Sequence, residues 1–394
     1  MNESGLSRLG ELFTRRTEKG RPGLPVFSVT MNDGLVNRED LDRKQDTSLE
    51  PEEHLLVEPG DIAYNTMRMW QGAFGLADRA GMVSPAYVVI RPKKNVDPAY
   101  VAQLLRTARM RYLLWAYSYG LTDDRLRLYF EDFAAIPVRV PNIGDQQRIA
   151  SILGTWDDAL SVARKLLSNA KVEVAATSAI LMSRVKAGKK VPLHQIAEVR
   201  TGLAKGKSGQ RDAIQMPYLR VANVQDGRLD LREVKLIDVA RDQVQRYALQ
   251  RGDVLMTEGG DFDKLGRGTV WNGEVEPCLH QNHVFAVRAN IDCLDPDFLA
   301  AVVASEYGRS YFLGCAKRST NLASINSSQL KAFPVPLPSL TEQQGIAAIL
   351  RSRIQAVRAN ERLVEELDQE KAALMAELFT DKRRVRLLST ETTQ

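Results

Sequence analysis

PVRVPNIGDQQRIASIL at residues 137–153 and PVPLPSLTEQQGIAAIL at residues 334–350 are two versions of one stretch, 197 positions apart. Earlier landmarks repeat in the same order: Gly60-Asp61 with Gly252-Asp253, Asp97-Pro98 with Asp295-Pro296, and Asp33-Gly34 with Asp226-Gly227. The spacing between partners varies from 192 to 198, as expected when loops change length around a common core. The chain is therefore a tandem duplication of a domain followed by a helix, and two copies are too few for a solenoid.

Each half begins with predicted strands and ends with a predicted helix. Runs of β-branched and aromatic residues predict strands at 26–29, 61–64 and 87–90, and at 218–221, 253–256 and 283–287. Asp97 and Asp295, each followed by proline, predict the N-terminus of a short helix. The proline-rich segments 137–141 and 334–338 predict a stiff, extended connector. We expect an α/β fold of the α+β kind, with two tandem domains.

A long amphipathic helix follows each connector. Apolar residues alternate at three and four positions, which is a heptad pattern, at Leu153, Trp156, Leu160, Ala163, Leu167, Ala170, Val174, Thr177 and Leu181. The same register in the second helix gives Leu350, Arg353, Val357, Asn360, Val364, Leu367, Lys371, Leu374 and Leu378. Each helix could pack on its own domain, but about 40 residues span about 60 Å, which is longer than such a domain is wide. We expect the two helices to pair with each other, with Asn360 fixing register or direction.

The overall composition sets limits on the class of protein. The chain has 394 residues, of which 44% are hydrophobic and 26% charged, so disordered and fibrous classes are excluded. No apolar stretch approaches the roughly 20 residues of a membrane span, and the N-terminus lacks the apolar region of a secretory signal. Three cysteines are too few for a disulfide framework and fit a reducing cytosol. The net charge of +5 permits a nucleic-acid partner without establishing one.

No catalytic motif is complete. Gly202–Ser208 resembles a phosphate-binding loop but has three residues between its glycines where the motif has four, so a basic surface loop is the better interpretation. The spacing of a zinc site is missing among Cys278, His280, His283 and Cys293. Asp261 and Asp263 have no companion acid with which to hold a nuclease metal. We expect no metal, no nucleotide and no active site in this chain.

Polar loops lie at matching places in the two halves, but their sequences differ. Arg, Lys, Asn and Gln side chains read base edges, while Ser and Thr hold phosphates. These could be ordinary surface loops. However, loops that differ between two copies of one frame are typical of two domains that each read a different DNA sequence. The candidate DNA-binding residues are Asn65, Arg68, Trp70, Gln71, Ser118, Tyr119 and Arg125 in the first half, and Lys264, Arg267, Gln281, Asn282, Lys317, Arg318, Thr320, Asn321 and Asn326 in the second.

On these residues the chain resembles the specificity (S) subunits of type I restriction–modification systems, over nearly its whole length. Besides the duplicated proline segments, the resemblance rests on Asp145–Ile149, Glu342–Ile346, Trp70–Gly72, Ser84–Tyr87 and Thr320–Asn326. One departure is that the first 20 residues align only loosely with 191–206.

The resemblance implies two target-recognition domains that each read one half of a split, asymmetric site in double-stranded DNA. It implies two spacer helices paired as an antiparallel coiled coil, two methyltransferase (M) subunits docked on that frame, and restriction-translocase (R) subunits joined through the complex. It implies no cofactor on this chain, with S-adenosylmethionine on the methyltransferase and ATP and Mg on the restriction subunit. The location would be the cytoplasm of a bacterium or archaeon, with no membrane partner and with a role in phage defence.

The corresponding domain limits are 1–142 and 189–339 for the recognition domains, 143–188 and 340–381 for the helices, and 382–394 for a tail. Two alternatives stay open. The chain could be the specificity subunit of a type IIB-like restriction–methylation enzyme, which differs only in its partner chains. It could also be a coiled-coil scaffold that binds protein and not DNA.

Overall fold

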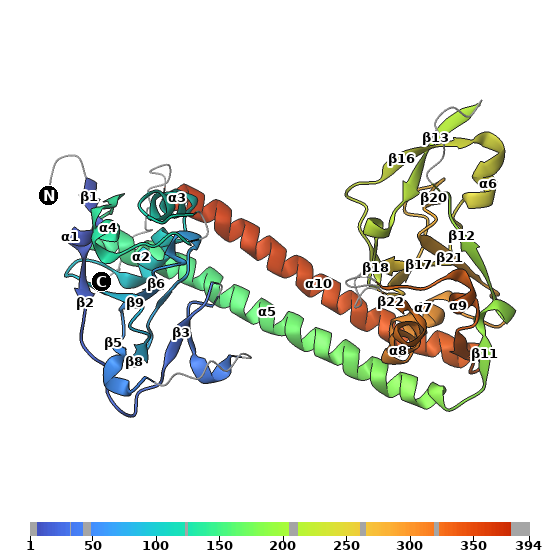
Figure 1. Cartoon of the computed structure of the whole chain (residues 1–394), viewed down its shortest axis with the longest axis horizontal. Coiled ribbons are helices and arrows are strands. Elements are labelled where there is room, and N and C mark those ends of the chain that lie inside the picture. The colour runs from blue at the N-terminus through green and yellow to red at the C-terminus, as the bar shows by residue number, and fades with distance from the viewer. Residues whose placement is uncertain are drawn as a thin grey trace, which may run out of the picture. The chain divides into compact units, whose positions relative to one another are not determined.

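A computed structural model describes residues 6–31, 33–41, 49–122, 125–204, 212–260, 265–318 and 323–379. The chain forms two compact units. Unit 1 comprises Met1–Ala163 and Leu363–Gln394, and unit 2 comprises Arg164–Arg362. Each unit therefore contains one mixed helix-and-strand part together with a segment of both long helices, α5 (Ile143–Lys186) and α10 (Leu340–Leu378) (Figure 1).

The central sheet of unit 1 has four antiparallel strands in the order β2-β9-β6-β7. Its helices α2 (Pro98–Leu105), α3 (Ala108–Ala116) and α4 (Phe130–Ala135) follow the sheet in the chain, and a short α1 (Leu9–Leu12) precedes it. The strands of the unit are β1 (Leu6–Arg8), β2 (Phe13–Arg16), β3 (Phe27–Val29), β4 (Leu35–Asn37), β5 (Leu55–Val57), β6 (Ile62–Asn65), β7 (Phe74–Leu76), β8 (Gly81–Val83), β9 (Tyr87–Pro92) and β10 (Pro137–Arg139).

Unit 2 repeats this plan with the order β12-β21-β17-β19, again antiparallel. It adds a sheet of β16-β13-β20 and a small sheet of β18-β23-β22. Its helices are α6 (Val244–Tyr247), α7 (Pro296–Ala304), α8 (Glu306–Cys315) and α9 (Ser327–Lys331). Its strands are β11 (Lys190–Pro192), β12 (Ala197–Thr201), β13 (Ala213–Leu219), β14 (Val224–Gln225), β15 (Arg228–Leu229), β16 (Lys235–Ala240), β17 (Asp253–Thr257), β18 (Gly259–Gly260), β19 (Gly268–Val270), β20 (Leu279–His280), β21 (Val284–Ala289), β22 (Lys317–Arg318), β23 (Ala323–Ser324) and β24 (Pro334–Pro336).

The predicted helix starts are confirmed in both units. The Asp97 carboxylate accepts a hydrogen bond from Tyr100 N at 2.8 Å, and the Asp295 carboxylate accepts one from Phe298 N at 2.9 Å. A proline follows each cap, where its missing N–H costs nothing. The two helices α2 and α7 therefore begin in the same way, 198 residues apart.

The proline-rich connectors are extended, as predicted, and each contains a short strand that pairs within its unit. In unit 1, β10 pairs antiparallel with β1, and in unit 2, β24 pairs antiparallel with β11. In each case the next residue of the N-terminal strand, Leu9 or Leu193, donates its N–H to a carbonyl just before the connector. This pairing matches Leu6–Arg8 with Lys190–Pro192, an equivalence that the loose N-terminal alignment did not reveal.

Each long helix packs apolar side chains, some from the predicted stripe and some beside it, against the unit to which that segment belongs. In unit 1, Ile149 and Leu153 of α5 share one hydrophobic core with Leu378 of α10. In unit 2, Met182 and Val185 of α5 share a core with Ile346, Ala347 and Leu350 of α10. All nine predicted stripe positions of α5 are buried or half-buried. The prediction for α10 was wrong at Arg353, which is exposed while the adjacent Ile354 is half-buried.

Candidate nucleic-acid interface

The same glutamine fixes the start of the long helix in each unit. The Gln146 side chain is 2% exposed, accepts a hydrogen bond from Asp97 N at 2.9 Å, and donates to the carbonyls of Asn95 and Pro141 at 3.2 and 2.8 Å. The Gln343 side chain is 0% exposed and makes the same three hydrogen bonds. It accepts from Asp295 N at 2.9 Å and donates to the carbonyls of Cys293 and Pro338 at 2.9 and 3.0 Å. This side chain ties the α2 or α7 cap, the connector and the long helix together.

A buried carboxylate holds the Gly-Asp turn of each unit, but its cationic partner differs. Asp61, 1% exposed, pairs with Arg16 of β2 at 2.6 Å. Asp253, also 1% exposed, pairs with Arg288 of β21, whose Nε and Nη2 donate to its two oxygens at 2.8 Å each. These hydrogen bonds raise the pKa of Arg288 above its ordinary value. A buried carboxylate needs such a partner, and different strands of the same sheet supply it.

The frame of unit 1 brings two of the predicted polar loops together. β6 ends at Asn65, whose side chain accepts a hydrogen bond from Met67 N at 3.0 Å and so shapes the turn. The turn continues as a single 3-10 helix, η3 (Met69–Gln71), and closes at Gly72 with φ of 95°. The backbone N–H of Leu128, at the end of the second loop, donates to the carbonyl of Thr66 at 2.9 Å. The first loop is therefore joined to the end of the second through Thr66 and Leu128.

The predicted residues of unit 1 do not all face solvent. Arg68, Gln71, Tyr119 and Arg125 are exposed, with Tyr119 at 64%. Trp70 is half-buried and donates Nε1–H to the carbonyl of Met67 at 3.1 Å. Ser118 is buried, and its hydroxyl donates to the carbonyl of Leu114 at 2.6 Å, so it supports the loop from within. The four exposed side chains are the ones available to a partner.

In unit 2 the small sheet of β18, β23 and β22 lies where three loops meet. β18 pairs with β23, and β23 pairs with β22. A Cβ on Gly259 would lie 2.7 Å from the carbonyl oxygen of Ala323, so this pairing requires glycine. The N–H of Ile325 donates to Glu258 O at 2.8 Å, and Glu258 N donates to His283 O at 2.9 Å. Glu258, His283 and the segments 317–318 and 323–325 are thereby neighbours.

The predicted residues of unit 2 divide into three groups. Lys317 is exposed, and Gln281 and Asn282 are half-buried on the turn between β20 and β21. Arg267 is half-buried and donates to the side chain of Gln225 at 3.3 Å, while Asn326 caps α9 by accepting from Gln329 N at 2.9 Å. Lys264, Thr320 and Asn321 lie outside the described residues, and Arg318 is described only as backbone in β22.

The exposed His283 on this surface was not among the predicted DNA-binding residues. The His283 ring is hydrogen-bonded through Nδ1 to the Glu258 carboxylate at 2.5 Å and lies 3.5 Å from the side chain of Asn282. The neighbouring His280 is different, because it is 2% exposed and its Nδ1 bonds to Val284 O at 2.7 Å. Burial lowers the pKa of His280, which keeps this ring neutral.

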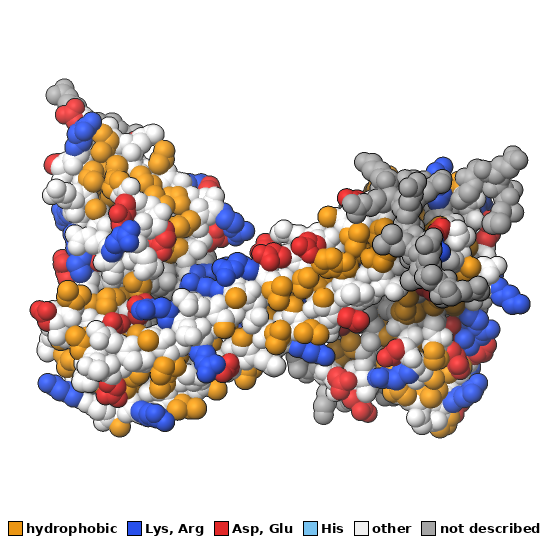
Figure 2. Space-filling model, turned by 180° about the vertical axis from the view of Figure 1, so that it is seen from behind, with side chains coloured by type: hydrophobic (Ala, Val, Ile, Leu, Met, Phe, Trp, Pro, Cys, Tyr) orange, Lys and Arg blue, Asp and Glu red, His pale blue; other side chains and the backbone are white. Residues whose placement is uncertain are grey.

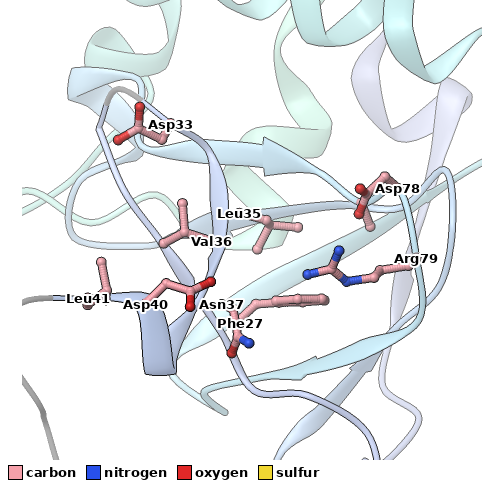
Figure 3. Close-up of a pocket in the computed structure, with 10 residues that line it drawn as sticks. Phe27, Asp33, Leu35, Val36, Asn37, Asp40, Leu41, Asp78 and Arg79 are labelled. Carbon is pink, nitrogen blue, oxygen red and sulfur yellow. The ribbon is translucent and has the colours of Figure 1, made fainter. Parts of the chain in front are cut away.

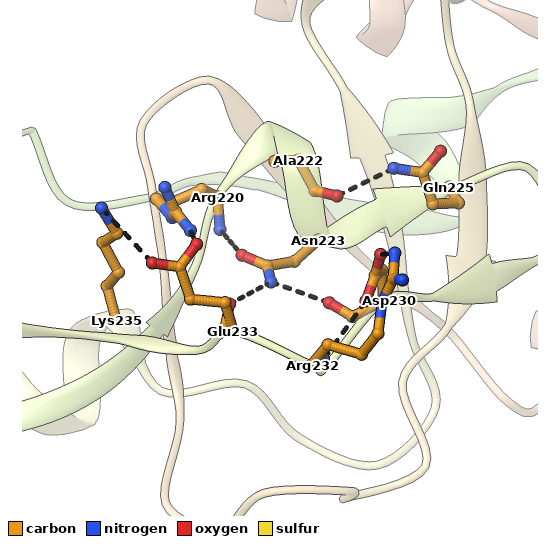
Figure 4. Close-up of polar contacts among 8 residues, drawn as sticks. All are labelled: Arg220, Ala222, Asn223, Gln225, Asp230, Arg232, Glu233 and Lys235. Atoms are coloured by element: carbon orange, nitrogen blue, oxygen red, sulfur yellow. Dashed lines mark hydrogen bonds and ion pairs between the residues drawn. The ribbon is translucent and has the colours of Figure 1, made fainter. Parts of the chain in front are cut away.

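A polar network shapes the hairpin that precedes this surface (Figure 4). The Asn223 side chain is 3% exposed, accepts from Arg220 N at 2.9 Å, and donates to the carbonyls of Asp230 and Glu233 at 2.8 and 2.9 Å. Arg232 donates hydrogen bonds to the Asp230 carboxylate from Nε at 3.0 Å and from Nη2 at 2.6 Å. These bonds lower the pKa of Asp230 to about 2. One buried amide therefore ties together the two ends of the loop from 220 to 233, whose Val224 side chain is buried in a small apolar core.

A pocket of about 360 Å³ opens beside the β3–β4 hairpin of unit 1 (Figure 3). Three carboxylates line it, those of Asp33, Asp40 and Asp78, and the Arg79 guanidinium lies over the Phe27 ring at 5.3 Å from its centroid. Three carboxylates repel phosphate. With Arg79 as the single cation among the lining residues, the charge of the pocket does not favour a phosphate.

Within the described ranges, no group of three or more His, Cys, Asp or Glu side chains could hold a metal ion. Of the cysteine and histidine residues considered above, Cys278 and His280 are buried and His283 points from an exposed turn. Gly202–Ala204 and Gly259–Gly260 are described, but the rest of the phosphate-loop-like segment and Asp261–Asp263 are not. None of the helices in the described part has the length and apolar character required to cross a membrane.

Two copies of one frame, each presenting its own polar loops and attached to a long helix, define a tandem two-domain protein. Residues 187–369 match the family described as type I restriction modification DNA specificity domain. The resemblance to type I specificity subunits is confirmed.

Individual relatives agree with this family. The chain is 30% identical over 190 residues to a putative type I restriction enzyme MjaX specificity subunit of Methanocaldococcus jannaschii, covering 48% of this chain and 44% of that protein. It is 21% identical over 277 residues to the EcoKI specificity subunit of Escherichia coli K12, covering 66% and 59%. The StySPI specificity subunit of Salmonella potsdam is 24% identical over 282 residues, covering 65% and 58%. The chain thus spans less than two thirds of the length of each.

Solved structures match the fold over almost the whole chain. A type I restriction–modification S subunit from M. genitalium gives a TM-score of 0.60 at 14% identity, covering 95% of this chain and 96% of that one. A chain from a type I restriction–modification system studied for complex assembly and conformational transition gives a TM-score of 0.54 at 18% identity, covering 96% and 98%. At these identities the likeness concerns the fold.

Proposed function

We propose that this chain is the DNA-specificity subunit of a type I restriction–modification complex and reads a split, asymmetric site in double-stranded DNA. The observation that carries the proposal is the contrast between frame and loops. Gln146 and Gln343 make the same three hydrogen bonds, whereas the exposed residues on the two frames differ. A reader made of two identical subunits needs a palindromic site, but two unlike readers do not.

The two long helices act as the spacer between the readers and pair as an antiparallel coiled coil. Three ion pairs between α5 and α10 support this: Asp157 with Lys371 at 2.5 Å in unit 1, and Lys171 with Glu361 at 3.1 Å and Glu173 with Arg353 in unit 2. From the first to the second ion pair of unit 2, the residue number rises on α5, from Lys171 to Glu173, and falls on α10, from Glu361 to Arg353. Antiparallel helices require this order. Lys371, which interrupts the apolar stripe, is 8% exposed and neutralised by Asp157.

Two methyltransferase subunits dock on this helical frame, and restriction-translocase subunits join through the complex. Apolar side chains exposed on α5 within unit 2 support a protein partner: Leu166 is 48% exposed, Val172 66% and Ile180 55%. Figure 2 shows hydrophobic side chains at the surface of the long helices. Such side chains favour burial against another protein. S-adenosylmethionine belongs to the methyltransferase and ATP with Mg to the restriction subunit, in the cytoplasm of a bacterium or archaeon.

Sequencing of methylated motifs in cells tests the two-reader proposal. Arg68→Ala with Arg125→Ala in unit 1 should relax or abolish recognition of one half-site, and Arg267→Ala with Lys317→Ala should act on the other. A lost base contact should cost about 1–3 kcal/mol. Loss of the same half-site from both pairs of variants would contradict the proposal. Partner chains that combine nuclease and methylase in one polypeptide would place the system in the type IIB group instead.

A purified-component assay tests whether the chain is catalytic. The chain alone, incubated with labelled S-adenosylmethionine and duplex DNA, should transfer no methyl group, and activity should appear when the methyltransferase is added. Methyl transfer by the chain alone would show an active site within it.

Heptad insertion tests the spacer. One heptad after Leu167 and one after Val364 keep the apolar stripe in phase and lengthen a helix pair by about 10 Å. At about 3.4 Å per base pair, the gap between unchanged half-sites should widen by at most about 3 base pairs. A stable, active variant with the original gap would show that the helices do not set it.

A further inference from the structure

Helix α3 of unit 1 presents an exposed face of arginine and aromatic side chains. Arg109, Arg111, Tyr112 and Trp115 are all exposed, with Tyr112 at 63% and Trp115 at 46%, and the two rings lie 5.8 Å apart. The opposite face is buried through Met110 and Leu114. The helix therefore leaves two guanidinium groups and a ring pair on its outer side.

The two arginines of this face have no charged partner among the described residues. Residues 106–122 contain three arginines and no carboxylate, and Asp123 and Asp124 follow in the sequence. Neither Arg109 nor Arg111 forms an ion pair or a side-chain hydrogen bond within the described part of the chain, whereas Arg106 lies over the Phe74 ring at 5.7 Å from its centroid. Positive charges placed together without a counter-charge destabilise the isolated protein slightly and favour an anionic partner.

The face continues the surface formed by the two polar loops of unit 1. A Cβ built on Gly72, at the end of η3, would lie 4.0 Å from Cδ of Arg111. Arg68 and Gln71 lie in the same turn as Gly72, and Tyr119 lies three residues beyond the end of α3. The α3 face and the loop surface are therefore parts of one basic and aromatic area.

The equivalent helix of unit 2 shows that the fold does not require this face. The N-caps Thr107 of α3 and Ser305 of α8 are 198 residues apart, which matches Arg111 with Arg309, Tyr112 with Ser310 and Trp115 with Leu313. Arg309 is neutralised by Asp226 at 2.5 Å, and its Nε donates to the carbonyl of Ala304 at 3.0 Å. The duplicated frame therefore forms in unit 2 with this arginine paired within the protein and without the two aromatic rings at these positions.

We propose that the α3 face is a DNA-backbone clamp that only the first recognition domain possesses. Arg109 and Arg111 bind phosphates of the duplex, for which a guanidinium has the matching donor geometry. Tyr112 and Trp115 pack against the adjoining sugars. Because these contacts fall on the backbone, they position the first domain without specifying sequence. The inference rests on the proposed DNA-reading function and assigns to it residues outside the reading loops.

The test measures DNA affinity against salt for the complex of the full chain with its methyltransferase. Each phosphate contact contributes about 0.9 to the slope of log affinity against log salt. Arg109→Gln with Arg111→Gln should therefore lower the slope by about 1.8, so that the loss of affinity between 50 and 200 mM salt shrinks about twelvefold. Affinity at low salt should fall equally for duplexes with and without the site, and the methylated motif should not change. Trp115→Ala should weaken binding at every salt concentration.

Arg21→Gln is the matched control, because Arg21 is an exposed arginine of unit 1 in the loop between β2 and β3. Its slope should equal that of the unsubstituted complex. An unchanged slope in the double variant would overturn the clamp and leave the DNA-reading function intact. Reduced assembly with the methyltransferase at an unchanged slope would show that α3 binds protein, which also overturns the clamp. Failure of the unsubstituted complex to bind any duplex would overturn the proposed function itself.

Discussion

Replacement of Gln343 by methionine should destabilise unit 2 far more than replacement of its neighbour Gln344. Methionine has a similar volume, but it cannot accept from Asp295 N or donate to the carbonyls of Cys293 and Pro338. Gln343 is fully buried, so water cannot replace these bonds. At about 0.5–1.5 kcal/mol for each of three bonds, the expected loss is about 1.5–4.5 kcal/mol. Gln344 is exposed, and its replacement should change stability by less than about 0.5 kcal/mol.

The assay is urea unfolding of the purified full chain, followed by far-ultraviolet circular dichroism. The midpoint should fall in Gln343→Met, with an unchanged dependence on urea, because the surface exposed by unfolding is the same. The first half supplies a second matched pair, since Gln146 is buried and Gln147 is exposed. Equal losses for the buried and the exposed glutamine would refute the reasoning, because the hydrogen bonds would then contribute nothing.

Three further outcomes are expected. Asp253→Asn should lower the stability of unit 2 by about 3–5 kcal/mol in thermal or urea unfolding, because it leaves the Arg288 charge without its buried partner. An NMR titration should find the Asp230 pKa at about 2, and Arg232→Gln should return it toward 3.8; the stabilisation from this pair is present above pH 3.8 and is lost as pH falls through about 2. A thiol reagent should label Cys293 and Cys315 before Cys278, whose pKa burial raises to about 12, and early labelling of Cys278 would contradict its burial.

The sequence alone determined the duplicated frame. The repeated proline segment, the Gly-Asp turns and the Asp-Pro caps are local patterns, and a local pattern predicts a turn or a helix start wherever it occurs. Four of the six predicted strands overlap strands of the two equivalent central sheets, namely β6, β9, β17 and β21. The heptad register likewise predicted the buried stripe of α5, because helical periodicity fixes which side chains share a face.

Only the tertiary structure decided what each residue of a pattern does. The Gln-Gln repeat does not say which glutamine is buried, and the Gly-Asp repeat does not say that Arg16 neutralises Asp61 while Arg288 neutralises Asp253. Ser118 is a residue type that can contact DNA but it is buried, whereas Tyr112 and Trp115 of α3, which belong to no repeated motif, are exposed. The physical reason is that burial and charge pairing depend on contacts between segments far apart in the chain. The order of residues within one segment does not determine those contacts.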